Sequence, residues 1–377
     1  MPAAKSFAKS AKRSLTLVVP DLFDRPSGIG RISQTLALAC TEWVRAHGAQ
    51  LAVIALHDTG AQRDLRVCPE DVAYRGHAGD RRRFALDVVR AAVAAPRALV
   101  IFGHANFAPL GLATALRRGR YAVVAHGVEA WAKLSPLREL ALRQAAEIWP
   151  VSRYTAEVVA RVHRIPNARI VPVRNCLDPL QPLRSIGPPP PGAPRFLVVS
   201  RLTYGDRDKG VDRAIEAFAL ARARLPEGTT LEIVGDGDDR ARLEALARAG
   251  TGEGRVVFHG AVADAALDAL FVACRAFVLP SRLEGFGLVF AEAMARGRAV
   301  IAAAAGATPE VVEDGVTGLL VAFDDRRALA DAIVALAEDP SHATQLGVAG
   351  RARLDAHFLY PRYAREVAAR LDTLLGT

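Results

Sequence analysis

The segment SRLEGFGLVFAEAMARG, from Ser281 to Gly297, carries the clearest structural pattern in this 377-residue chain. It follows an apolar run, Ala276–Leu279, that is typical of a buried strand, and it continues into helix-forming residues at Leu288–Ala295. Two glycines, Gly285 and Gly287, stand where this helix begins. A strand, a short loop and a helix in succession form the repeating unit of α/β proteins, so the segment predicts that class.

The same alternation of apolar strands and helices extends along the whole chain. Before residue 180, strands are predicted at Leu15–Val19, Leu51–Leu56, Ala98–Phe102, Tyr121–Ala125, Ile148–Val151 and Ile170–Val173. After residue 194, further strands are predicted at Phe196–Ser200, Leu231–Val234, Val256–Phe258 and Ala299–Ala302. Helices are predicted there at Val211–Leu225, Arg240–Ala249, Ala265–Ala273, Leu288–Ala295 and Arg326–Ala337.

A proline-rich stretch, Pro179–Pro194, divides this pattern and contains four consecutive prolines at 188–191. Proline lacks a backbone donor and favours extended backbone, which makes such a stretch a semi-rigid linker. We therefore expect two doubly wound, Rossmann-like α/β domains with a cleft between the ends of their strands. The expected parts are an N-terminal domain (1–180), a linker (181–194), a C-terminal domain (195–357) and a last helix (358–377). A return of that helix to the first domain is left open.

Basic side chains are concentrated in the first half of the chain. Residues 1–194 carry 27 basic and 14 acidic side chains, whereas residues 195–377 carry 22 and 26. The first half is therefore expected to meet an anionic partner, for which a phosphorylated acceptor, a membrane surface and nucleic acid are candidates. Aromatic residues are only 6% of the chain and no zinc-finger spacing occurs, so no nucleic-acid partner is expected.

The run Arg81–Arg83 has two explanations that the sequence leaves open: a solvated helix face, or contact with anionic lipid. The apolar run that follows the basic N-terminus, Leu15–Val19, is too short for a signal peptide. The longest uncharged run, Ala98–Leu116, contains glycine and proline and does not suit a bilayer span. We expect a cytoplasmic protein with reduced cysteines, and peripheral contact with the inner face of the cell membrane stays open.

Two clusters of residues at predicted strand ends suit an anionic ligand. Bare backbone at Gly285 and Gly287 leaves N–H groups free at a helix N-terminus, where phosphate and sugar oxygens bind favourably. Glu284 lies in the same loop and Glu292 two turns into the helix, although two glutamates at this spacing also occur by chance. After another strand, Arg201 and Lys209 form a cationic pair that suits a diphosphate.

The segment 281–297 and the following AVIAAAAGATPEVVEDGVTGLLV (299–321) resemble the donor-binding region of the retaining GT-B glycosyltransferases of family 4, the glycosyl transferases group 1. The resemblance extends over most of the chain. It includes SRL…DKG (200–210), LEIVGDG (231–237), VFHGAV (257–262), SGIGR (27–31), AHGVEAW (125–131), PVSRYT (150–155) and VRNCLDP (173–179).

The resemblance implies a GT-B fold, a nucleotide-sugar donor bound by the second domain, and a role for each of twelve residues. Arg201 and Lys209 would bind the donor diphosphate, and Glu284 with the backbone of Gly285, Phe286 and Gly287 would hold the transferred sugar. Glu292 would bind the ribose, and the turn from His259 to Val262 would line the base. Gly28 and Gly30 would approach the phosphates from the first domain, and His126 would lie near the reacting sugar. Eight positions separate Arg201 from Lys209, more than is common in the family, so Thr203–Asp208 is expected to form a longer, charged loop.

Three further motifs have competing interpretations. Gly28–Ser33 resembles a dinucleotide fingerprint that lacks its third glycine, and a purely structural turn competes with a ligand-approaching loop. Asp236-Gly237-Asp238 could hold a metal on donor phosphates, but a turn before a helix is the favoured explanation because Arg201 and Lys209 already supply positive charge. No metal or other cofactor is expected. Glu129 and Trp131 are candidates for shaping an acceptor pocket.

The sequence therefore predicts a retaining glycosyltransferase. It would move a hexose, with mannose from GDP-mannose slightly favoured by resemblance, from a nucleoside diphosphate sugar to a saccharide or lipid-linked saccharide acceptor. The product class would be a surface polysaccharide or glycolipid. Three alternatives remain: a nucleotide-sugar epimerase with the same fold, a non-catalytic nucleotide-binding module and, more distantly, an NAD-dependent dehydrogenase.

Overall fold

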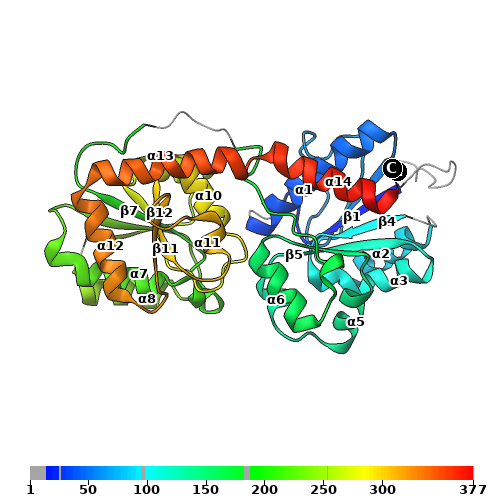
Figure 1. The fold of residues 1–377 in the computed structure, drawn as a ribbon, viewed down its shortest axis with the longest axis horizontal. Helices are drawn as coiled ribbons and strands as arrows, with labels where there is room; N and C mark the ends of the chain where they lie inside the picture. The colour runs from blue at the N-terminus through cyan, green and yellow to red at the C-terminus, as the bar shows by residue number, and fades with distance from the viewer. Residues whose placement is uncertain (1–13, 25–26, 95–97, 182–186, 253, 377) are drawn as a thin grey trace. The chain divides into compact units, whose positions relative to one another are not determined.

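The computed structural model describes residues 14–24, 27–94, 98–181, 187–252 and 254–376. The chain folds as two compact units (Figure 1). The first unit comprises Met1–Pro179 together with Tyr360–Thr377, and the second comprises Leu180–Leu359. The break between the units therefore falls at the start of the proline-rich stretch.

The first unit contains one six-stranded sheet in which all neighbouring strands are parallel. Its strands are β1 (Ser14–Val19), β2 (Gln50–Ala55), β3 (Ala73–Gly76), β4 (Leu99–Phe102), β5 (Arg120–Ala125) and β6 (Glu147–Pro150), in the order β3-β2-β1-β4-β5-β6. Every residue of the central strand β4 is buried, which is why the sequence shows an unbroken apolar run there.

Helices connect these strands and cover the sheet. They are α1 (Gly28–His47), α2 (Arg81–Ala94), α3 (Gly111–Leu116), α4 (Val128–Trp131), α5 (Pro136–Gln144) and α6 (Arg153–His163), with short 3-10 helices η1 (Ala105–Leu110) and η2 (Asn167–Arg169). The buried Phe84 and Val88 of α2 belong to one apolar cluster with Val100 and Phe102 of the sheet. Residues of α2 at helical spacing thus bury one stripe against one face of the sheet.

The second unit repeats the same plan. Its strands are β7 (Arg195–Val199), β8 (Thr230–Val234), β9 (Val256–Gly260), β10 (Ala276–Leu279), β11 (Ala299–Ala303) and β12 (Gly318–Val321), in the order β12-β11-β10-β7-β8-β9. Its helices are α7 (Val211–Ala221), α8 (Arg240–Thr251), α9 (Asp264–Ala273), α10 (Leu288–Ala295), α11 (Thr308–Val311), α12 (Arg326–Glu338) and α13 (Pro340–His357), with 3-10 helices η3 (Tyr204–Lys209) and η4 (Arg222–Arg224). Both units are therefore doubly wound α/β folds, which confirms the predicted fold class.

Both sheets reverse their strand order at one point. In the first unit the chain builds outward from β1 to β3 and then returns to place β4 on the other side of β1. In the second unit the reversal falls between β7 and β10. The loops that leave the carboxyl ends of two such strands diverge, and ligands of open α/β sheets bind in the resulting crevice.

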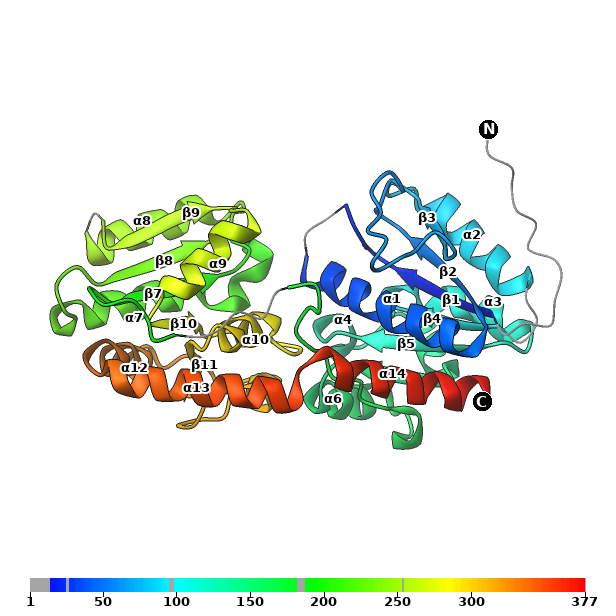
Figure 2. The ribbon, with the colours of Figure 1, turned by 90° about the horizontal axis from the view of Figure 1, so that it is seen from above.

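The last helix, α14 (Tyr360–Leu375), packs against α1 within the first unit, and Figure 2 shows the two side by side. Four residues at helical spacing are buried: Tyr363, Val367, Leu371 and Leu374. The indole N–H of Trp43 donates to Asp372 at 2.8 Å. The Arg362 guanidinium donates to the carbonyl of Arg174 at 2.6 Å. This helix therefore belongs to the core of the first unit, although almost two hundred residues separate it from its nearest sequence neighbours there.

Several helices and strands differ from the sequence predictions. Ile170–Val173 is not a strand: Val171 and Val173 donate to the carbonyls of Ile148 and Pro150 on β6, but Pro150 has no N–H to return a bond, so only an isolated bridge forms, between Ile170 and Ile148. The short edge strands β3 and β12 and the long helix α13 were not predicted. The last helix begins at Tyr360 rather than Phe358, and Phe358 is a buried residue of the second unit. The proposed loop Thr203–Asp208 is largely a 3-10 helix, η3.

Helices long and apolar enough to cross a membrane are absent from the described parts of the chain. All four cysteines, Cys40, Cys68, Cys176 and Cys274, are free thiols and buried. Burial raises the pKa of the Cys40, Cys176 and Cys274 thiols to about 12 because the thiolate would lose its hydration. The basic N-terminal residues Lys5, Lys9 and Lys12 lie outside the described residues.

Candidate functional site

The reversal point of the second sheet brings two predicted clusters together. Strands β7 and β10 are hydrogen-bonded neighbours, with Phe196 opposite Ala276. The segment after β7 contains Arg201 and Lys209, and the segment after β10 contains Glu284 and leads into α10. A ligand bound beyond these two strand ends would therefore contact both segments.

Lys209 and Glu284 form an ion pair across these two segments. The Lys209 Nζ lies 2.8 Å from the Glu284 Oε2, although 75 positions separate them in the sequence. The Lys209 and Glu284 side chains are 29% and 11% exposed, so both are partly shielded from water. The positive residue expected to meet a diphosphate and the acid expected to meet a sugar are thus direct neighbours.

Close backbone contacts fix this geometry and require glycine at two positions. Gly210 follows Lys209 in a left-handed conformation (φ +74°), and a Cβ there would lie 2.4 Å from the Pro280 carbonyl oxygen. Gly306 is also left-handed (φ +58°), and a Cβ there would lie 2.7 Å from the Glu284 carbonyl oxygen. That carbonyl accepts the N–H of Ala307 at 2.9 Å. Larger residues at either glycine would push the segments apart.

Gly285, Phe286 and Gly287 lie immediately before α10 and were predicted to contribute their backbone to the site. Gly287 is the residue before the helix, and the helix points its positive end toward the ligand-binding edge of the sheet. The Phe286 side chain is 4% exposed and packs edge-to-face on Phe358, with ring centroids 5.6 Å apart. Phe286 therefore presents only its backbone, while Gly285 is half-buried next to Glu284.

Arg201 and Glu292 lie on the same two segments but are not part of the Lys209–Glu284 contact. The Arg201 side chain is 79% exposed, and its guanidinium lies 2.8 Å from Asp206. Asp206 also accepts the Thr203 hydroxyl at 2.6 Å, so a fixed carboxylate holds Arg201. Glu292 is half-buried in the middle of α10. Asp206 was not predicted as a site residue from the sequence. Its position in an unusually long, charged segment was the sequence feature that could have indicated its role.

His259 differs from its predicted setting. It lies inside strand β9, which ends at Gly260, and not in a turn. Its Nε2 is 3.0 Å from a carboxylate oxygen of Glu232 on the neighbouring strand β8. Only the residues after Gly260, including the half-buried Val262, lie in the connection to α9. The His259 ring is therefore held against the sheet by a buried acid.

The Asp236-Gly237-Asp238 sequence forms a turn whose carboxylates have partners within the protein. Asp238 accepts the backbone N–H of Tyr204 at 2.9 Å, and Asp236 accepts that of Gly237 at 2.8 Å. Helix α8 begins two residues later, at Arg240. Among the residues that the structure describes, no three histidine, cysteine or acidic side chains are grouped as metal ligands would be.

In the first unit, Gly28 and Gly30 form the first turn of α1. The Ser27 hydroxyl caps this helix by accepting the Gly30 N–H at 2.9 Å. The glycines are therefore helical, whereas a loop was the expectation. The loop before them is fastened by Asp58, a fully buried acid that the sequence analysis missed: it accepts the backbone N–H groups of Leu22 at 2.8 Å and Phe23 at 3.0 Å.

His126 follows β5 and lies beside a second histidine. Its Nε2 is 2.8 Å from the Gly103 carbonyl oxygen, so this nitrogen carries the proton, and Glu129 accepts its backbone N–H at 2.6 Å. The ring of His104, which follows β4, is centred 5.7 Å away. Burial lowers the pKa of His104 to about 4, because the imidazolium would lose its hydration. His104 is therefore neutral near pH 7, and it lies at the end of β4, where the strand order of the first sheet reverses.

Trp131 is the other residue considered for an acceptor pocket. Its indole N–H donates to the Thr155 hydroxyl at 3.3 Å, and its ring meets Tyr154 edge-to-face with centroids 5.3 Å apart. These contacts join α4 to the start of α6, and Trp131 is half-buried.

Comparison with known proteins identifies the family to which the second unit is similar. The family model described as "Glycosyl transferases group 1" matches residues 182–353. A GDP-mannose-dependent alpha-(1-6)-phosphatidylinositol monomannoside mannosyltransferase of Mycolicibacterium smegmatis is 33% identical over 283 residues, which cover 67% of this chain and 70% of that protein. A glycogen synthase of Mycobacterium tuberculosis is 35% identical over 207 residues, which cover 53% of this chain and about half, 48%, of that protein.

Solved structures show the same architecture over nearly the whole chain. The crystal structure of Anabaena HepE in complex with UDP and glucose matches with a TM-score of 0.77 and 21% identity, and the match covers 96% of this chain and all of the HepE chain. Two parallel six-stranded sheets with this strand order are thus the GT-B fold. Given the extended match to the mycobacterial relative and the family model over the second unit, the chain belongs to the glycosyl transferases group 1 and is a hexosyltransferase with the GT-B fold.

Proposed function

We propose that this enzyme transfers a hexose from a nucleoside diphosphate sugar to a saccharide or lipid-linked saccharide, with retention of the anomeric configuration. The observation that carries the proposal is the Lys209–Glu284 pair at the reversal point of the second sheet, 2.8 Å apart and beside the N-terminus of α10. The name of the mycobacterial relative favours GDP-mannose as the donor and a glycolipid as the acceptor.

In the proposed reaction, the bond between the sugar C1 and the diphosphate oxygen breaks and a new bond from C1 to the acceptor oxygen forms on the same face. The acceptor hydroxyl passes its proton to the departing diphosphate, so a separate base is not required. Negative charge grows on the diphosphate as the bond breaks, and preorganised cations lower the energy of that state. Lys209 and Arg201 supply this charge together with the amides at the start of α10, so the proposal includes no metal ion.

The remaining residues have binding roles in this proposal. Glu284 and the backbone of Gly285, Phe286 and Gly287 hold hydroxyls of the transferred sugar, and Glu292 binds the ribose. The residues from His259 to Val262 border the base. Gly28 and Gly30 offer backbone to the phosphates, and His126 contacts the reacting sugar.

Binding of the donor is tested by thermal denaturation with GDP-mannose, UDP-glucose, GDP and UDP, with NADH as a control. A ligand that binds only the native state raises Tm, and one present at about 100 times its Kd stabilises by about 2.7 kcal/mol. We expect one nucleotide family to raise Tm by several degrees and NADH to have no effect.

Transfer is then assayed with and without a lipid-linked acceptor, since sugar interconversion without acceptor would indicate an epimerase. A Tm unchanged by every nucleotide would contradict the proposal.

An acceptor in a membrane requires a surface that meets lipid, and the first unit carries a suitable one. Helix α2 exposes a stripe at helical spacing, and α3 packs beside it. We define the α2–α3 surface by its exposed members: Arg82, Leu86, Arg90, Val93, Leu116, Arg117 and Arg118. Leu116 is 85% exposed. Arginines mixed with exposed leucines match the headgroup and acyl regions of an anionic bilayer, so we propose that this surface contacts the membrane.

Vesicle sedimentation tests this contact. The protein is expected to bind phosphatidylglycerol vesicles and not phosphatidylcholine vesicles, and salt should weaken binding because each basic residue contributes about 1 kcal/mol near an anionic surface. Charge reversal at Arg82 and Arg117 together should reduce partitioning more than about tenfold. Charge reversal at Arg222 and Arg248 together, both on exposed positions of the second unit, is the matched control and should have little effect. Equal losses in both variants would show general electrostatic attraction instead.

A further inference from the structure

The segments that carry Lys209 and Glu284 are joined by a second set of contacts immediately beside that pair. The Arg282 backbone N–H donates to the Asp208 carbonyl oxygen at 2.7 Å. The Ser281 hydroxyl donates to the same carbonyl at 3.4 Å. Residues 208 and 282 are therefore held next to each other by their backbones, in addition to the close approach of Gly210 to Pro280.

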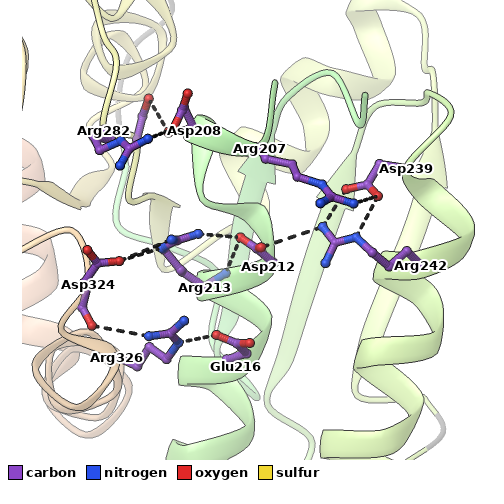
Figure 3. Close-up of polar contacts among 11 residues, drawn as sticks. Arg207, Asp208, Asp212, Arg213, Glu216, Asp239, Arg242, Arg282, Asp324 and Arg326 are labelled. Carbon is purple, nitrogen blue, oxygen red and sulfur yellow. Dashed lines mark hydrogen bonds and ion pairs between the residues drawn. The ribbon is translucent and has the colours of Figure 1, made fainter. Parts of the chain in front are cut away.

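The side chains of Asp208 and Arg282 form an ion pair. Here the acid lies on the segment after β7, whereas in the Lys209–Glu284 pair the acid lies on the segment after β10. The Arg282 guanidinium lies 2.5 Å from the Asp208 carboxylate, as Figure 3 shows, whereas Lys209 lies 2.8 Å from Glu284. One segment thus carries a negative and then a positive charge, and the other carries a positive and then a negative charge. A shift of the segment after β7 by one residue would place Arg207 or Lys209 opposite Arg282, so the two pairs favour a single register.

The segment with Asp208 is also anchored on its other side. Arg207 donates to Asp239 at 3.3 Å, and Asp239 is bound by Arg242 at 2.5 Å (Figure 3). The Asp239 side chain is only 3% exposed, and hydrogen bonds from Arg242 hold the pKa of this carboxyl below its ordinary value. The segment is therefore tied to the start of α8 as well as to the segment after β10.

Arg282 has a further support that keeps its guanidinium in place. It lies over the ring of Phe323, with 5.2 Å from its Cζ to the ring centroid, and Arg213 covers the same ring at 4.0 Å. A long exposed side chain loses conformational entropy when it forms an ion pair. Stacking on an aromatic ring already restricts the side chain, so the further loss is smaller. The Arg282–Asp208 contact is thus better fixed than an isolated surface pair.

We propose that Asp208 and Arg282 are positioning residues that hold Lys209 opposite Glu284 for donor binding. This inference rests on the proposed function, because it takes Lys209 and Glu284 as donor ligands. Neither Asp208 nor Arg282 needs to touch the donor. Their effect is to keep the segment after β7 and the segment after β10 in one register.

A sign argument separates positioning from simple electrostatics. The donor is an anion, so an independent effect of charge would make Asp208→Asn strengthen donor binding and Arg282→Gln weaken it, and the two effects would add in the double variant. A positioning role predicts a different pattern of donor binding, in which the two single variants have effects of the same sign that do not add. Both single variants weaken donor binding, and the double variant is no worse than either single variant because one contact has been lost in all three.

The experiment is a double-mutant cycle on the full-length enzyme with donor KM, kcat and Tm as readouts. Each single variant is expected to raise the donor KM about three- to fivefold, the range of a well-fixed exposed ion pair, with kcat and the acceptor KM nearly unchanged. Arg224→Gln breaks another exposed ion pair of the same unit, with Asp331, at the opposite end of α7, and should leave the donor KM unchanged.

Opposite and additive effects of the two single variants, or no effect of either, would overturn the positioning role. Failure of the proposed function would look different, because wild-type enzyme would then bind no nucleoside diphosphate sugar or Lys209→Met would remain fully active. We expect the Asp208 and Arg282 variants to lower Tm by the same amount as Arg224→Gln and to be the only variants that raise the donor KM. This result would exclude general destabilisation as the cause of the raised KM.

Discussion

Replacing Lys209 by methionine is expected to lower kcat/KM for sugar transfer at least about a hundredfold while the protein stays folded. Methionine keeps the length of the side chain and removes its charge. The variant loses a charged hydrogen bond to the departing diphosphate, and removal of one such stabilising group costs about 10²–10³ in rate. It also leaves Glu284, which is only 11% exposed, without its partner 2.8 Å away. Release of the nucleoside diphosphate in the presence of acceptor measures the loss.

Matched variants make this result specific. Arg222→Met removes a positive charge from an exposed position at the far end of α7 and should retain activity. Glu284→Gln should lose activity to a similar degree, because an amide accepts fewer hydrogen bonds from sugar hydroxyls and cannot balance Lys209. Unchanged kcat/KM in Lys209→Met, with unchanged Tm, would remove the basis for the proposed donor site.

Replacing Leu371 by aspartate is expected to unfold the first unit or to detach α14 from it. Leu371 is fully buried on the face of α14 that packs on the unit, together with Val367. Burial of one such side chain contributes about 1.5–3 kcal/mol, and an unpaired buried carboxylate adds a larger penalty, against a typical domain stability of about 5–15 kcal/mol. Thr373→Asp, on an exposed position of the same helix, should have little effect.

The buried cysteines provide the measurement for this variant. Cys40 and Cys176 belong to the first unit and Cys274 to the second, and all three are unexposed with strongly raised thiol pKa values. Thiol labelling followed by peptide mapping should show fast reaction at Cys40 and Cys176 in Leu371→Asp, and slow reaction at Cys274. Slow labelling of all three cysteines would show that α14 is dispensable for the first unit.

The sequence predicted the strands and helices around the candidate site well, because burial in parallel sheets produces unbroken apolar runs. The helix Leu288–Ala295 has the same limits in the structure. The errors fall where packing is weaker or local chemistry decides. β3 alternates exposed and half-buried residues at the edge of its sheet, so it lacks an apolar run. Ile170–Val173 has one, but its neighbour β6 ends in Pro150, which has no N–H to continue the ladder.

The contacts of the site were harder to foresee than its location. Strand order could not be read from the sequence, so the proximity of Lys209 to Glu284 rested on resemblance alone. Asp206 and Asp208 lie in a segment that was expected to be a loop. Asp206 pairs with Arg201 of the same segment only because that segment folds back as η3, and Asp208 pairs with Arg282, 74 positions away in the sequence. Asp58 belongs to no sequence motif. Its role depends on the backbone N–H groups of a loop that follows another strand, and the sequence does not show that this loop lies beside it.

A crystal structure of the enzyme with a bound nucleoside diphosphate sugar tests the central claim most directly. The account predicts diphosphate oxygens within hydrogen-bonding distance of the Lys209 Nζ and the Arg201 guanidinium, with the sugar beside Glu284 and the backbone of Gly285–Gly287. A donor bound with its diphosphate on Asp236 and Asp238 through a metal ion, or bound away from the ends of β7 and β10, would contradict it.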